Sequence, residues 1–170
     1  REALYKKNKY VESFTVYNSK LYYFTEWLKQ LFAETQGKEG KGILPISNVN
    51  TRDLHSMGQF LQEGHDIIFE TVIGVENSDV IKIAKYDKTL HEINRIAQEK
   101  VCLAHYRDKT PSLVIDIETL DEYNIGQLVR FFITAAIVGA VLIDVNPFDQ
   151  PGVEKYKKLV NEALNSTYIF

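Results

Sequence analysis

Apolar positions along the chain alternate between two spacings, a period of two residues and a period near 3.6 residues. Strand-like runs cover residues 10–17, 43–46, 66–75 and 111–117, with residues 80–84 as a further candidate. Helical spacing covers residues 18–36, 52–64, 88–104 and 120–142, and a last helix begins at Pro151. Strands that alternate with helices of this length are typical of a parallel sheet with helices on both faces. The pattern therefore predicts an α/β fold with three layers, helix–sheet–helix.

Local signals add detail to three of these elements. Asn18 can cap the first long helix. The unbroken apolar run Leu113–Ile115 is typical of a strand in the centre of a sheet. Thr119 and Glu122 have the spacing of a capping box, which predicts that the long apolar helix begins there.

Composition and charge exclude several classes of protein. The chain has 170 residues, 45% of them hydrophobic, which is enough for one compact domain. Its formal net charge of −3, with Lys and Arg scattered among Asp and Glu, argues against a nucleic-acid partner. Cys102 is the only cysteine, so it cannot form an internal disulfide or a cysteine zinc site. We expect it to be a small buried side chain on a helix.

The longest apolar stretch, Phe131–Ile143, contains 13 residues interrupted only by Thr134. A membrane-spanning helix needs about 20 residues, so we predict a core helix and no membrane partner. Residues 1–10 are basic and polar, without the apolar segment of a signal peptide. Because the only methionine is Met57, we expect further sequence before Arg1.

Gln30 and Glu34 are four residues apart and therefore lie on one face of the first long helix. That face also carries Tyr23 and Trp27, and it lies opposite the apolar stripe of the same helix. Two large aromatic side chains beside Gln and Glu indicate a second partner, either another domain or a ligand. The alternative is that Glu34 is an ordinary surface charge at a helix end.

His55 follows the loop 48–51 and lies near the start of the next predicted helix. Backbone N–H groups point outward in a first helical turn, and an imidazole there can reach a ligand. The alternative is an exposed histidine that makes one hydrogen bond. The other histidines, at positions 65, 91 and 105, share no metal-ligand spacing with it, so we predict no metal site.

Lys157 lies on the last predicted helix. The expected buried side of this helix carries Val153, Tyr156, Val160 and Leu164. Lys157 is about 20° from Leu164 in helical projection, so it leans over that buried edge. Lysines normally avoid such a position unless the ammonium group has a partner or a cleft. The alternative is that the side chain extends past the apolar edge into water.

Two stretches resemble the phosphoglucose isomerase family, in its short bacterial form. The first is residues 31–43 (LFAETQGKEGKGI), continuing through 51–64 (TRDLHSMGQFLQEG) to 69–73 (FETVI). The second is residues 145–157 (VNPFDQPGVEKYK), which contains the specific pattern Gln-x-Gly-Val-Glu-x-x-Lys. Both occur in the expected order, and the resemblance extends over nearly the whole chain.

The resemblance implies a role for five residues. Glu34 would be the base that moves a proton between C1 and C2 of the sugar. His55 would assist ring opening, and it would do so in the active site of the neighbouring subunit. Lys157 would stabilise developing charge, and Gln30 and Gln150 would line the substrate pocket.

The sequence also departs from the family pattern around the proposed base. Ala33 stands where a glycine is usual, Thr35 replaces serine, and Gln36 often appears as glutamate. Residues 139–140 and Asp144 also differ from the usual small residues. These departures concern loop detail and remove no proposed catalytic side chain.

The resemblance further implies a fold and a reaction. Residues 1–170 would be the carboxy-terminal sugar-isomerase domain of a two-domain enzyme, and the amino-terminal domain would lie outside this sequence. The reaction would interconvert glucose 6-phosphate and fructose 6-phosphate through a cis-enediol. It would need no cofactor and would take place in the cytoplasm, in a homodimer. The 170 residues alone would be inactive.

Two alternatives remain open. A phosphosugar-binding module without catalysis could use the same fold, although a sensor needs no base such as Glu34. A purely structural domain would place Glu34 and Lys157 far apart on an inert surface.

Overall fold

The computed structural model describes residues 1–78 and 80–165. Four parallel strands form the main sheet in the order β2-β1-β3-β6. Their bounds are β1 (Val11–Val16), β2 (Leu44–Val49), β3 (Ile68–Asn77) and β6 (Ser112–Thr119). Two short strands, β4 (Lys82–Ile83) and β5 (Lys88–Thr89), form a separate antiparallel pair.

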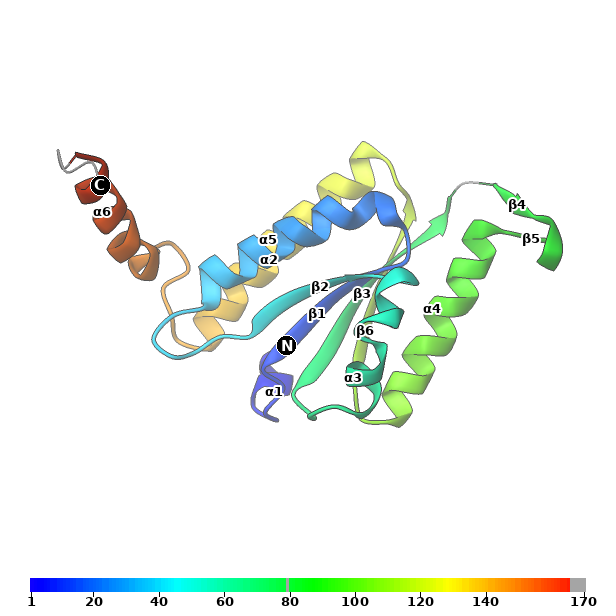
Figure 1. The fold of residues 1–170 in the computed structure, drawn as a ribbon, viewed down its shortest axis with the longest axis horizontal. Helices are drawn as coiled ribbons and strands as arrows, with labels where there is room; N and C mark the ends of the chain where they lie inside the picture. The colour runs from blue at the N-terminus through cyan, green and yellow to red at the C-terminus, as the bar shows by residue number, and fades with distance from the viewer. Residues whose placement is uncertain (79, 166–170) are drawn as a thin grey trace.

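The helices are α1 (Glu2–Tyr5), α2 (Tyr22–Gln36), α3 (Gly58–Glu63), α4 (Leu90–Arg107), α5 (Glu122–Leu142) and α6 (Pro151–Asn165). Short 3-10 turns occur at η1 (Ser19–Leu21), η2 (Arg52–His55) and η3 (Ala84–Tyr86). Helices α2 and α5 cover one face of the sheet and α3 and α4 cover the other (Figure 1). The predicted three-layer α/β fold is therefore confirmed.

The order in which strands are added to the sheet reverses its direction at β1. The chain leaves β1 through α2 and returns as β2 on one side, with Val11 opposite Leu44. It then passes through α3 and enters β3 on the other side of β1, with Val11 opposite Ile68. The loops that follow β1 and β3 therefore diverge, which leaves a crevice at the carboxyl ends of these strands.

The core lies between β1, α2 and α5. Phe14 of β1 stacks on Phe32 of α2, with ring centroids 5.2 Å apart, and meets Phe132 of α5 edge-on at 6.0 Å. Leu28 is fully buried one turn before Phe32. The apolar stripe predicted for this helix is thus the surface that packs on the sheet.

Helix α5 is long and apolar enough to cross a membrane, judged by length and composition alone. One side of it is buried against the sheet and α2, at the regularly spaced positions Leu128, Phe132, Ala136 and Ala140. This spacing of four residues places one stripe of the helix in the core, so the predicted core helix is found for that stripe only. The opposite side is exposed, with Phe131 at 53% and Val141 at 64%.

The predicted start of α5 is wrong. Asp121 caps the helix by accepting a hydrogen bond of 2.8 Å from the backbone N–H of Asn124. Thr119 is still the last residue of β6, and its hydroxyl donates to the Asp121 carboxylate. An aspartate two residues further on is an equally good cap, and it allows the strand to continue.

The predicted central position of β6 is also wrong. It is an edge strand of the four-stranded sheet, and Leu113 and Val114 are 40% and 49% exposed. A continuous apolar run indicates that both faces of a strand can be covered. It does not say whether another strand pairs beyond it, and within residues 1–78 and 80–165 none does.

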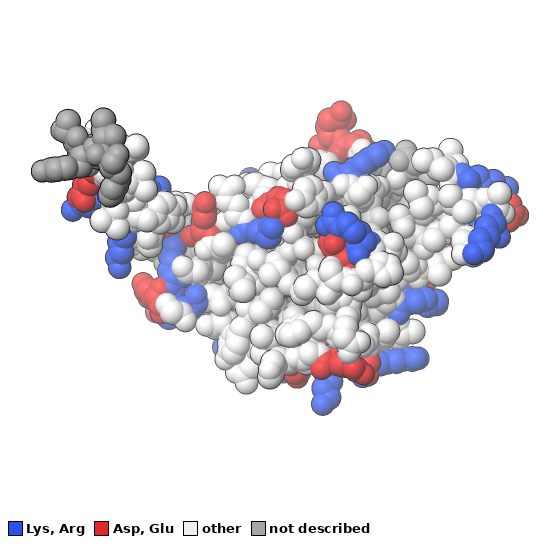
Figure 2. Space-filling model, viewed as in Figure 1, with Lys and Arg blue, Asp and Glu red and all other residues white. Residues whose placement is uncertain are grey.

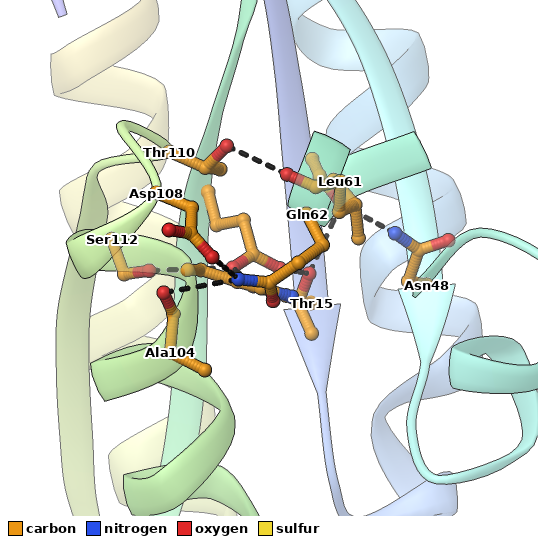
Figure 3. A network of polar contacts seen from close by, with 11 residues as sticks. Thr15, Asn48, Leu61, Gln62, Ala104, Asp108, Thr110 and Ser112 are labelled. Carbon is orange, nitrogen blue, oxygen red and sulfur yellow. Dashed lines mark hydrogen bonds and ion pairs between the residues drawn. The ribbon is translucent and has the colours of Figure 1, made fainter. Parts of the chain in front are cut away.

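A buried polar layer joins the sheet to α3 and α4 (Figure 3). Glu70 of β3 is 1% exposed, and its carboxylate lies 2.6 Å from Nδ1 of His105 on α4. The hydroxyls of Thr15 and Ser112 donate to the same carboxylate at 3.0 and 3.3 Å. On the α3 side, Thr110 donates to the Leu61 carbonyl at 2.8 Å. A buried carboxylate needs such partners, so this layer fixes α4 against the sheet.

Candidate active site

Glu34 lies in the last turns of α2, at the amino end of the sheet, because α2 runs back against the direction of β1. Nε2 of Gln30 donates to one of its carboxylate oxygens at 3.3 Å. Nε2 of Gln150 donates to the other oxygen at 2.7 Å. The structure therefore brings together three of the five predicted site residues, with the carboxylate held between two amides.

Two loops are tied together to bring Gln150 to Glu34. Lys38 donates to the carbonyl of Asn146 and forms an ion pair of 2.9 Å with Asp149. The Lys38 ammonium holds the pKa of Asp149 below its usual value. Lys41 donates to the carbonyl of Asp144 at 2.8 Å. These contacts fix the segment that precedes α6.

The loop after α2 needs a glycine at position 42. Gly42 has φ of +108°, and a Cβ there would lie 2.6 Å from the carbonyl oxygen of Gln36. Only glycine adopts this conformation without strain and leaves room for the neighbouring backbone. The glycine-lysine loop is therefore a tight return from α2 to β2 that also places Lys38 and Lys41.

The Glu34 carboxylate opens into a small cavity of about 200 Å³. Its lining consists of Ala33, Glu34, Gly37, Lys38, Gln150, Pro151, Gly152 and Val153. The cavity is open to solvent, and it offers a carboxylate, amide groups and a cation. Within residues 1–78 and 80–165, no group of three or more His, Cys, Asp or Glu is placed to hold a metal ion.

Lys157 does not line this cavity. Its ammonium pairs with Glu154 at 3.0 Å, three residues earlier on α6. Glu154, and more weakly Glu34, raise the pKa of Lys157. The lysine is thus near enough to be influenced by the Glu34 charge but is not bonded to it.

The predicted buried side of α6 is wrong for this chain. Tyr156, Val160 and Leu164 are 57%, 52% and 77% exposed, and only Val153 is partly covered. The helix begins at Pro151, as predicted, but it extends away from the sheet (Figure 1). An amphipathic helix needs a surface to cover its apolar side, and the described chain provides none for α6.

His55 lies at the opposite end of the sheet from Glu34. It is exposed and belongs to η2, which follows the carboxyl end of β2. The turn is fixed by Asp53, which accepts a 2.7 Å hydrogen bond from the backbone N–H of Val49 and pairs with Arg52. Six residues of β2 at about 3.3 Å each separate the two ends by roughly 20 Å. His55 and Glu34 of one chain therefore do not meet.

The aromatic face predicted beside Gln30 and Glu34 is only partly exposed. Tyr23 is 81% exposed. Trp27 instead packs against the core, with its ring centroid 5.4 Å from that of Phe24. The prediction that Trp27 belongs to an open surface is wrong, because its indole ring is partly buried against the core residues.

Charged groups outside this cluster form no field of one sign on the face shown in Figure 2. Lys and Arg lie interspersed with Asp and Glu there. This distribution agrees with the net charge of −3 and with the absence of the basic stripe typical of nucleic-acid binders, as far as that face shows it.

The sequence model of the family described as phosphoglucose isomerase matches residues 82–168, just over half of the chain. The chain belongs to the phosphoglucose isomerase family. The matched region includes α5, α6 and the segment that carries Gln150 and Lys157. Glu34, Gln30 and His55 lie outside it and depend on the comparison with whole relatives.

Curated members of the phosphoglucose isomerase family match nearly the entire chain. The glucose-6-phosphate isomerases of Clostridioides difficile and Fusobacterium nucleatum are each 46% identical over 93% of this chain. The enzyme of Acholeplasma laidlawii is 43% identical over the same share. The chain spans only 38% of the length of the first two relatives.

Two solved structures share the fold. A hypothetical protein from Thermus thermophilus superposes with a TM-score of 0.83 over 97% of this chain and 44% of its own, at 23% identity. A glucose-6-phosphate isomerase from Chlamydia trachomatis superposes with the same TM-score over 95% of this chain and 36% of its own, at 20% identity. At this level of identity the two structures show the fold alone.

Sequence reasoning missed the pair Lys38 and Asp149. Both residues lie inside the two stretches that resemble the family, and their opposite charges were a usable signal. Nothing in the sequence pattern indicated a cavity at the carboxyl ends of the strands, where Asn50 is buried.

Proposed function

We propose that this chain is the carboxy-terminal sugar-isomerase domain of a glucose-6-phosphate isomerase. It would interconvert glucose 6-phosphate and fructose 6-phosphate by proton transfer through a cis-enediol. Membership of the family supports the reaction class. The single observation that carries the catalytic assignment is the Glu34 carboxylate at the edge of a cavity. It is held by the amide of Gln30 on the same helix and by that of Gln150, which is 116 residues away in the chain.

Glu34 would act as the base. Aldose–ketose isomerisation removes a proton from the carbon next to a carbonyl and returns it to the adjacent carbon. Each oxygen of Glu34 accepts one amide hydrogen bond, which orients the carboxylate and leaves each oxygen able to accept another. Gln30 and Gln150 would hold the base and contact the sugar hydroxyls.

Lys157 and His55 would act on the same substrate from other positions. If α6 docks on a surface supplied by the rest of the enzyme, Lys157 would reach the oxygen where enediolate charge develops. The pKa of Lys157 is raised mainly by Glu154 and only weakly by the Glu34 charge. His55 would assist ring opening in the site of the neighbouring subunit, because it lies at the opposite end of β2 from Glu34.

The complete site would draw on groups outside this chain. The amino-terminal domain would supply the donors that hold the substrate phosphate, and the enzyme would be a cytoplasmic homodimer without a cofactor. The exposed apolar side of α6 and the exposed Tyr23 support a missing partner surface.

The test compares Glu34→Gln with Glu63→Gln in the whole protein. Both glutamates accept a hydrogen bond from a glutamine four residues earlier, at 3.3 Å for Glu34 and 2.7 Å for Glu63. The glutamine amide keeps the shape of the glutamate carboxylate but cannot act as a base. Glu34→Gln should therefore lower solvent deuterium exchange at C1 and C2 of the sugar by about 100-fold or more. Glu63→Gln should exchange like the parent.

Exchange at the parent rate in Glu34→Gln would refute the assignment of the base. If the parent protein bound substrate without catalysing exchange, the phosphosugar-binding alternative would be favoured. A loss of exchange in both variants would point to a general defect and remove the special role of Glu34.

A further inference from the structure

A second cavity lies at the end of the sheet opposite Glu34, in the crevice that the diverging loops leave at the carboxyl ends of the strands. Its volume is about 360 Å³. It is lined by the ends of β1 and β2, by β3, and by the first turns of α4. The lining residues are 17–20, 49–52, 73–75, 78, 90, 91, 94, 95 and 98. In parallel sheets, ligands bind at this kind of switch point. We call this cavity the carboxyl-end crevice.

A buried amide in this crevice has no partner. Asn50 is 4% exposed and lines the crevice. Within residues 1–78 and 80–165, neither its side-chain oxygen nor its side-chain nitrogen has a hydrogen-bond partner. The Asn50 amide lies near the Tyr17 hydroxyl, but the geometry falls short of a hydrogen bond. Burial raises the pKa of this hydroxyl, and the nearby amide offsets part of that rise. Buried polar groups without partners are rare in proteins, and each calls for an explanation.

The charges around the crevice indicate what would satisfy the amide. Lys20, Arg52 and Arg95 line it, and none of its described lining residues is Asp or Glu. Arg52 and Arg95 each pair with a carboxylate, at 2.6 Å in both cases, that is not part of the lining. A guanidinium group has five N–H donors, so it can keep such a pair and still donate to a phosphate oxygen.

The remaining lining is suited to a small, partly apolar body. Val49, Ile73 and Val75 form an apolar floor. Ser19 and Thr51 add hydroxyl groups at the sides. A cavity of about 360 Å³ is at the lower end of the range for small-molecule sites.

We propose that the carboxyl-end crevice binds a small phosphate monoester. The phosphate lies against the cationic side chains, and the Asn50 amide hydrogen-bonds to the polar body of the ligand. Within one chain this site is separate from the Glu34 cavity, since Glu34 and Gln150 lie at the amino end of the sheet. The proposal does not depend on the proposed reaction.

The test follows methyl NMR signals of Ile73 and Val75 in the whole protein during titration with glycerol 1-phosphate. These methyl groups belong to the crevice floor, whereas Val153 lines the Glu34 cavity and serves as the internal control. Saturable shifts at Ile73 and Val75 are expected. Glycerol and chloride at matched ionic strength should leave both signals unchanged, and inorganic phosphate should shift them more weakly.

Three variants make the test specific. Asn50→Leu should fold, because it removes an unpartnered buried amide, and should weaken binding about tenfold or more. Arg52→Gln should weaken it by a similar factor because a charged donor is lost. Glu34→Gln should bind like the parent, which separates this result from the isomerase proposal.

The proposal would be overturned if the Ile73 and Val75 signals of the parent protein did not shift saturably with glycerol 1-phosphate. This holds whether the rest of the protein covers the crevice or leaves it empty. Unchanged affinity in both Asn50→Leu and Arg52→Gln would overturn it as well. If Asn50→Leu does not fold, Asn50→Asp provides the same test, because its carboxylate has the same size and should repel phosphate.

Discussion

The two ends of the sheet differ in how much of a site one chain completes. At the carboxyl end, three strand ends and α4 enclose a crevice that already contains cations and a buried amide. At the amino end, Glu34 and Gln150 meet over a shallow cavity, and the next element, α6, extends away with its apolar side exposed. This chain alone lines the crevice at the first end, whereas at the second end the described residues provide no surface that covers the apolar side of α6.

This difference follows from the fold. Helices α2 and α4 start at the carboxyl end, so their first turns and the preceding loops gather there. The cavity at the amino end is lined by the last turn of α2, the loops held by Lys38 and the first turn of α6. A base placed at that end needs further walls, and a family whose members are much longer than this chain can supply them.

The largest expected effect tests whether the two ends serve different active sites. In the whole protein, His55→Ala and Glu34→Gln should each lower isomerase activity about 100-fold or more. Mixing the two inactive proteins, with subunit exchange, should restore activity, because one site of each heterodimer combines an intact Glu34 with an intact His55. With random exchange about a quarter of the sites are intact.

A steady-state assay before and after exchange measures this recovery. Mass spectrometry of differently labelled subunits must show that heterodimers form. Heterodimers without recovered activity would mean that His55 acts within its own chain, contrary to the separation of the two ends across β2.

A second prediction concerns the polar layer that holds α4 against the sheet between the two ends. His105→Leu removes one partner of the buried Glu70 carboxylate, which would keep only hydroxyl donors. Removal of a hydrogen-bond partner from a buried polar group lowers the free energy of unfolding by about 1–3 kcal/mol, and by more where the group is charged. Urea unfolding followed by circular dichroism measures the change.

The matched control for that variant is the exposed pair of Lys82 and Asp87, whose side chains are 67% and 87% exposed. Lys82→Leu should change the free energy of unfolding by about 1 kcal/mol or less. Equal effects in the two variants would show that the buried layer does not hold the sheet and α4 together.

The smallest expected effect is the reactivity of Cys102 on α4. Burial raises the pKa of its thiol to about 11, so it is almost wholly protonated at pH 8. Its alkylation by iodoacetamide should be about tenfold slower, or more, than that of an exposed cysteine with a pKa near 8.5. The rate should keep rising up to about pH 11, and a plateau near pH 8.5 would contradict the structure.

Sequence patterns predicted the elements whose side chains repeat at a regular period. The stripe of α2 with Leu28 and Phe32, and the start of α6 at Pro151, are both found in the structure. A regular hydrophobic period shows that one face of a helix or strand is buried, and this can be read from a short stretch of sequence. The three-layer arrangement followed from the alternation of the elements.

The remaining features depended on contacts between distant segments. The apolar run of β6 fits a central strand and an edge strand equally well, and the missing neighbour decides between them. The pattern of α6 predicted a buried side without saying what would cover it. Asn50 is one amide between a strand and a turn, so no period marks it, and only the crevice around it gives it meaning.

Above all, we propose that the amino end of the sheet carries the base but not a complete active site. A coupled isomerase assay tests this most directly, with the 170-residue chain and the whole protein at equal molarity. Positioning of the substrate lowers the activation barrier by about 7–11 kcal/mol. The chain alone should therefore show less than about a thousandth of the activity of the whole protein. Activity within about tenfold of the whole protein would contradict the proposal, because these 170 residues would then position the substrate unaided.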